Sequence, residues 1–161
     1  MGVSAKPRKK YRPRARLQNP MQYVIESLSP VRNQVSYVTD WKIKLHAAMN
    51  WLTKGEASKQ DVDTLLAGHY LCGAWVGMGI GTDYKSVLIC SHVALADLYI
   101  RGDKTRRYVL RALELQALND MIELHDVMVD EVTVEQMEKA RLIAMRNLAH
   151  YRPGQVYMPV V

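Results

Sequence analysis

The chain has 161 residues, of which 48% are hydrophobic, and a formal net charge of +6. This length is that of one domain, and a domain of this size buries enough apolar surface to fold without a disulfide or a structural metal. The 48% apolar content is that of a globular protein.

The positive charge is concentrated at the start of the chain. Residues 1–20 contain seven basic residues and no acid: Lys6, Arg8, Lys9, Lys10, Arg12, Arg14 and Arg16. The rest of the chain contains the other 15 basic residues and all 16 acids, so the body of the protein is close to neutral. Arms of this kind bind nucleic acid, other polyanions or acidic protein surfaces, although a passive solubility tail has the same composition.

We expect residues 1–18 to form an extended arm. Pro7 and Pro13 prevent a continuous helix, and Tyr11 places an aromatic ring among the charges. The helical body is predicted over residues 19–151. An extended, partly apolar tail with two prolines is predicted over residues 152–161.

Two helices are predicted in the first part of the body. Asn-Pro at 19–20 is a helix-start signal, with an N-cap asparagine and proline at the first helical position, and predicts a short helix over 21–28. Ser-Pro at 29–30 repeats the signal. It predicts a long helix from about residue 30 to Lys54, where Gly55 provides a natural C-terminal stop.

The third predicted helix follows Ser58 and contains the most constrained stretch, residues 65–83. The stretch holds five glycines, and residues 64–82 carry no formal charge. Because glycine costs a helix up to about 1 kcal/mol, such a helix must gain close packing, a turn or room for a ligand. We expect it to be a buried spine that frays near Gly79–Gly81. The glycines, His69 and the lack of a second span argue against a membrane helix, so no membrane partner is expected.

Three further helices are predicted. The fourth begins at Thr82 or Asp83 and ends at 101–102, followed by a polar loop over 103–110. The fifth covers 112–131. A capping box, Thr133 with Gln136, opens the sixth, which ends near Tyr151. Strand signals are nearly absent, so the sequence predicts an all-α antiparallel bundle of five or six helices with an extended basic N-terminal arm.

The glycine-rich stretch and the arm supply the candidate ligand-binding residues. They are Arg8, Lys9, Lys10, Tyr11, Arg12, Arg14, Arg16, His69, Trp75, Gly79 and Gly81. The run 77–81 is only superficially similar to a phosphate-binding loop, because no strand precedes it and no Gly-Lys-Ser/Thr follows. Helix packing, with small residues at Gly73 and Gly77, and a glycine turn are the competing interpretation.

Metal binding is a further hypothesis. One histidine falls on each of the five later helices: His46, His69, His92, His125 and His150. Glu123, Asp126 and Asp130 share one face of the fifth helix, next to His125. The Glu-x-x-His and His-Glu-x-x-His patterns are missing, so satisfied polar groups are favoured and no cofactor or metal is expected.

Covalent catalysis has little support in the sequence. Cys72 and Cys90 lie in apolar helical patterns without a basic neighbour, so we expect buried free thiols, in keeping with a reducing cytoplasm. No Gly-x-Ser-x-Gly elbow occurs and no signal-peptide pattern is seen. The expectation is a protein that is not an enzyme.

Three segments carry a resemblance: KPRKKYRPR (6–14), NPMQYVIESLSPV (19–31) and ALNDMIELHDVMVDEVTVEQMEKA (117–140). They resemble small helical accessory proteins of unassigned function from tailed phages and prophages of Gram-negative bacteria. The resemblance implies an accessory protein that acts in the cytoplasm of a bacterial host cell by binding and blocking host machinery or by sequestering a signal.

The function predicted is that of a non-enzymatic accessory binding protein and homo-oligomer that inhibits or sequesters a host component. One form of this function is an anti-defence protein, which would bind an anionic nucleotide-type signalling molecule or an acidic host protein. Two alternatives stay open. One is a nucleic-acid-associated protein that uses the arm on phosphates, and the other is a metal-dependent helical enzyme.

Overall fold

The computed structural model of the chain describes residues 20–30 and 35–151. The predicted arm (1–18) and tail (152–161) lie outside the described residues. Within those residues the chain forms α-helices and one short 3-10 helix, and no strand. The elements are α1 (Pro20–Leu28), α2 (Val35–Lys54), α3 (Lys59–Gly77), η2 (Thr82–Tyr84), α4 (Lys85–Thr105), α5 (Ala112–Glu131) and α6 (Val134–His150).

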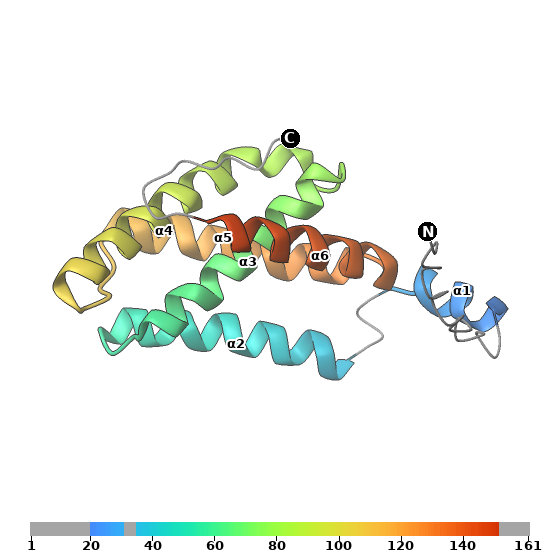
Figure 1. Cartoon of the computed structure of the whole chain (residues 1–161), viewed down its shortest axis with the longest axis horizontal. Helices are drawn as coiled ribbons and strands as arrows, with labels where there is room; N and C mark the ends of the chain where they lie inside the picture. Colours follow the sequence, from blue (N-terminus) through green and yellow to red (C-terminus); the bar gives the residue numbers. More distant parts are fainter. Residues whose placement is uncertain (1–19, 31–34, 152–161) are drawn as a thin grey trace, which may run out of the picture.

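The central element is α3, which crosses obliquely between α2 and the other long helices (Figure 1). It contacts α2, α4, α5 and α6. Twelve of its residues are buried, including an uninterrupted run from Gly68 to Val76. A Cβ on Gly68 would lie 2.7 Å from a methyl of Leu45, so the glycine allows α2 to approach closely. The prediction of a buried spine is confirmed.

Local capping chemistry explains where two helices begin. Ser58 donates its backbone N–H to the Asp61 carboxylate over 2.7 Å at the start of α3. At the start of α6, Thr133 Oγ1 accepts from the Gln136 backbone N–H and Gln136 Oε1 accepts from the Thr133 backbone N–H. These reciprocal bonds satisfy amide groups that have no partner inside the helix.

Two predicted boundaries are wrong. The long helix expected from about residue 30 does not begin there, because Pro30 forms a bridge with Thr133 and α2 begins at Val35. We expected α4 to end at 101–102, but it continues through Gly102 to Thr105. The Tyr108 ring lies directly against Gly102, and Tyr108 Oη donates to the Asp103 carboxylate at 3.0 Å. Packing against this ring compensates for a glycine inside the helix, and Arg106, with φ of 58°, ends it in the left-handed region.

The cysteine prediction is half wrong. Cys72 is buried on α3, whereas Cys90 is exposed on α4. Cys90 falls on the outer face of α4, because the buried residues of that helix follow the spacing of Leu88, Ser91 and Leu95. Neither cysteine forms a disulfide within the described residues.

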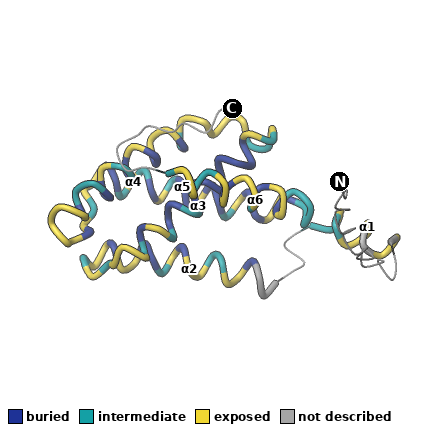
Figure 2. The backbone as a smooth tube through the Cα atoms, viewed as in Figure 1, coloured by how far each residue is buried: buried dark blue, intermediate teal, exposed yellow. Residues whose placement is uncertain are grey.

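The short helix α1 is set apart from the other helices (Figure 1). Its C-terminal end is tied to the start of α6, where the Val134 backbone N–H donates to the Ser29 carbonyl at 3.0 Å and Pro30 forms an isolated bridge with Thr133. Figure 2 shows α1 as largely exposed. Among the helices of the described ranges, none is long and apolar enough to cross a membrane.

Candidate functional site

The glycine-rich turn that follows α3 is built as a helix stop. Gly79 and Gly81 adopt φ of 86° and 68°, which are left-handed values that favour glycine. The Ile80 backbone N–H donates back to the Trp75 carbonyl at 2.9 Å, which satisfies a carbonyl at the end of the helix. A Cβ on Gly81 would also lie 2.9 Å from the end of Met128. The conformation therefore explains both glycines without a ligand.

His69, a second candidate, lies in the interior. Its Nδ1 is 3.0 Å from Ser91 Oγ, and the same hydroxyl donates to the Leu88 carbonyl at 3.1 Å. Since the serine has one proton to donate, it accepts from His69 Nδ1–H, and Nε2 is the unprotonated nitrogen. Burial, and then the nearby ring of His92, lowers the pKa of His69 to about 3. His69 is thus a neutral core histidine.

Trp75 is also completely buried, and its ring centroid is 5.7 Å from that of His125. Neither Trp75 Nε1 nor His125 Nε2 has a hydrogen-bond partner within the described part of the chain. The other nitrogen of His125 is 3.3 Å from Asp126 Oδ1. The Trp75 and His125 side chains are both closed off from solvent, and polar atoms lie in the interior beside them.

Asp126 connects two histidines. His46 Nε2 lies 2.8 Å from its second carboxylate oxygen, opposite the His125 contact. Burial alone would raise the pKa of Asp126, but the hydrogen bonds from His125 and His46 outweigh it and lower that pKa to about 2. The carboxylate therefore stays charged and pairs with both rings.

The histidines do not gather at one point. His69 and His92 lie together, with ring centroids 5.4 Å apart, and His125 lies with Trp75. His46 and His150 are exposed. Asp130 pairs with Lys42 at 3.2 Å. Across residues 20–30 and 35–151 no three histidine, cysteine or carboxylate side chains are placed to hold a metal ion.

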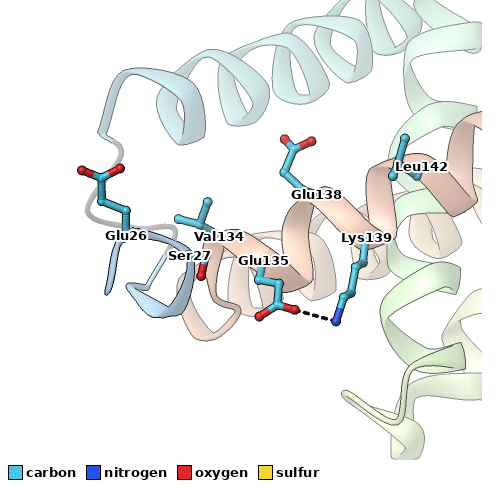
Figure 3. Close-up of a pocket in the computed structure, with 7 residues that line it drawn as sticks. All are labelled: Glu26, Ser27, Val134, Glu135, Glu138, Lys139 and Leu142. Atoms are coloured by element: carbon cyan, nitrogen blue, oxygen red, sulfur yellow. Dashed lines mark ion pairs between the residues drawn. The ribbon is translucent and has the colours of Figure 1, made fainter. Parts of the chain in front are cut away.

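An accessible groove of about 420 Å³ lies between α1 and the first turns of α6 (Figure 3). Its lining residues are Glu26, Ser27, Val134, Glu135, Glu138, Lys139 and Leu142. Lys139 Nζ is 2.7 Å from Glu135 Oε1, so the lysine of this lining is already paired. The surplus of carboxylates makes the groove unsuitable for an anion.

The outer face of α1 is apolar. Met21, Val24, Ile25 and Leu28 are all exposed, and their spacing of three, four and seven residues places them on one side of the helix. Glu26 and Ser27 line the groove, which places the polar side of α1 toward α6. The helix therefore presents its apolar side away from the helices beside it.

Of the candidate ligand residues, the structure places His69 and Trp75 in the buried part of α3, and Gly79 and Gly81 in the turn that follows it. The arm residues Arg8, Lys9, Lys10, Tyr11, Arg12, Arg14 and Arg16 lie outside the described residues. Sequence reasoning missed the exposed face of α1, although its apolar spacing can be read directly from residues 21–28. No protein-family model, curated protein or solved structure matches the chain.

Proposed function

We propose that the protein is a non-enzymatic binding protein, a helical bundle that carries a basic N-terminal arm and holds an anionic target on that arm. In line with the phage and prophage proteins that it resembles, the target would be a component of a bacterial host cell. The charge distribution is the observation that carries this proposal. All 16 acids lie in the described ranges, whereas seven basic residues precede them in a segment without an acid.

The groove between α1 and α6 supports the arm as the anion-binding element. Glu26, Glu135 and Glu138 would repel a phosphate or a carboxylate. The bundle also pairs several of its own cations, including Lys42 with Asp130 and Arg101 with Glu114. An anionic ligand would therefore find its strongest unopposed positive charge on residues 6–16.

The interior supports binding rather than chemistry. His69 is neutral and closed off from solvent, and burial raises the pKa of the Cys72 thiol, which disfavours a thiolate nucleophile. Both carboxylate oxygens of Asp126 are engaged in hydrogen bonds with His46 and His125. We therefore place the binding residues on the arm, with the helices as their support.

A matched pair of triple variants tests the proposal. Lys6, Lys9 and Lys10 are changed to glutamine in one protein, and the exposed bundle lysines Lys44, Lys85 and Lys104 in the other. Binding is followed by fluorescence anisotropy with three labelled probes: a dinucleotide, a single-stranded oligonucleotide of about 20 nucleotides and a glutamate-rich peptide. The arm variant should bind its preferred probe about tenfold more weakly or worse, and the bundle variant about as well as the wild type.

The probe that binds identifies the target class. Preference for the oligonucleotide, with affinity falling steeply between about 50 and 200 mM salt, would favour the nucleic-acid alternative. Preference for the dinucleotide or the peptide would favour a signalling molecule or an acidic host protein. Equal losses in both triple variants, or no binding of any probe by the wild type, would refute the arm as the anion-binding element.

A further inference from the structure

The apolar face of α1 has no cover within the described residues. Met21, Val24, Ile25 and Leu28 are 68%, 47%, 64% and 59% exposed. They belong to a helix of nine residues that packs against α6. A single apolar residue on a surface is ordinary, but four on one face of a protruding helix mark an interaction surface.

The length of α1 adds a second argument. An isolated helix of nine residues is marginal in water, because nucleation is costly and most helix stability in proteins comes from packing an apolar face. Here the polar side of α1 meets α6, and the Gln22–Glu26 hydrogen bond supports that side. A partner that covers the apolar side would supply the packing that this helix lacks.

We propose that the partner is the α1 helix of a second copy of this chain, packed antiparallel across a two-fold axis. In this arrangement Met21 of each copy faces Leu28 of the other, and Val24 and Ile25 lie at the centre. The seam is self-complementary, as a two-fold interface must be. The apolar seam consists of residues of α1 and contains none of the arm residues assigned to the anionic target, so this inference goes beyond the proposed function.

Charge favours the antiparallel arrangement. In each copy, residues 6–16 with their seven positive charges precede the start of α1 at Pro20. A parallel pair of α1 helices would therefore bring two strongly basic segments together. An antiparallel pair instead brings each basic segment to the Leu28 end of the other α1. That end is bonded to the start of α6, beside five carboxylates: Glu26, Asp130, Glu131, Glu135 and Glu138. Three of them are paired with Lys42, Lys139 and Arg141, which leaves a surplus of two negative charges at this corner.

The size of the seam makes this charge contact necessary. Stable dimers bury roughly 1,200–2,000 Å² in total, more than two nine-residue helices supply by themselves. The attraction between the positive charges of residues 6–16 and the carboxylates of the second copy would therefore have to add to the apolar seam. The dimer should therefore weaken in high salt and when residues 1–18 are removed.

Sedimentation velocity of the full chain tests the association. We expect a species of twice the chain mass of 18.4 kDa at micromolar concentration. Ile25→Glu should raise the dissociation constant about tenfold or more, because it buries a charge in the seam. Leu113→Glu, at a site 86% exposed on α5, is the matched control and should leave the constant unchanged. Circular dichroism checks that both variants keep their helices.

Disulfide trapping tests the orientation. In a Cys90→Ser background, which removes the exposed thiol, Met21→Cys and Leu28→Cys proteins are oxidised separately and as a mixture. The mixture should give a cross-linked dimer and each protein alone much less. A wild type that stays monomeric, which is also the result if the chain's own arm or tail covers α1, would overturn the proposal. So would a dimer that Ile25→Glu leaves intact, or cross-linking of Met21→Cys with itself.

Discussion

Gly102 shows how one residue can fix the contact between a helix and the loop that follows it. The Tyr108 ring occupies the space of the missing side chain, so a Cβ there would collide with several ring atoms. The ring cannot move freely, because its hydroxyl is bonded to Asp103. Gly77, at the end of α3, has nothing within 4 Å of the same position.

These two glycines should therefore respond in opposite directions to alanine. Gly102→Ala should lower the free energy of unfolding by about 1–3 kcal/mol, since overpacking exceeds the gain in helix propensity. Gly77→Ala should raise it by about 0.5 kcal/mol. Urea denaturation of both variants measures the difference. If both alanines stabilise the protein to the same extent, the Tyr108 contact does not constrain Gly102.

The helix pair α4 and α5 is joined by a buried carboxylate. Arg101 donates to both oxygens of Glu114 at 2.7 and 2.6 Å, and the Arg111 backbone N–H donates to the same carboxylate at 2.8 Å. Burial would raise the pKa of Glu114, but these donors outweigh it and keep that pKa below its usual value. Glu114 thus caps the start of α5 and fastens it to α4.

Glu114→Gln should cost about 1–3 kcal/mol of stability, because it leaves the half-buried Arg101 guanidinium with weaker acceptors. Glu138→Gln is the control, since its bond to Arg141 lies on the surface and within one helix, and it should cost less than about 0.5 kcal/mol. Thermal unfolding monitored by circular dichroism compares the two. Equal small losses would contradict a structural role for the Arg101–Glu114 pair.

At the scale of elements, the sequence predicts those helix boundaries that depend on neighbouring residues in the chain. The boundaries of α5 and the start of α6 follow from short-range patterns and the Thr133–Gln136 box, and the structure reproduces them. The end of α4 depends on Tyr108, a contact that no local pattern encodes. The apolar face of α1 was visible in the sequence, but whether neighbours cover it is decided by tertiary packing.

The candidate site was predictable to a smaller extent for the same reason. The sequence located the glycine turn and the end of the helix, but not the left-handed backbone of Gly79 and Gly81. It placed one histidine on each later helix, but not which of them face inward. His69, His92 and His125 are buried and His46 is not, because the orientation of each helix about its axis is set by the whole core.

At the scale of the whole molecule, the buried histidines should make the folded protein less stable in acid. His69 and His92 lie side by side on α3 and α4, and burial lowers the pKa of both. In the unfolded chain each would titrate near its ordinary pKa of about 6.5. Below that pH the two histidines bind protons in the unfolded chain but stay neutral in the folded protein. The free energy of unfolding therefore falls as the pH decreases.

For His69 alone, a folded pKa of about 3 implies a loss of about 2 kcal/mol between pH 7 and pH 5, with His92 adding in the same direction. Asp126 contributes only at lower pH, because its pKa is lowered from an ordinary value that already lies below 4. Urea denaturation at several values between pH 7 and pH 5 should show this loss and a clearly smaller one in His69→Leu. His150→Gln, at an exposed position, should keep the wild-type slope. If His69→Leu also kept that slope, the interior histidine would have to be charged in the folded protein, which its closed surroundings and its bond to Ser91 oppose.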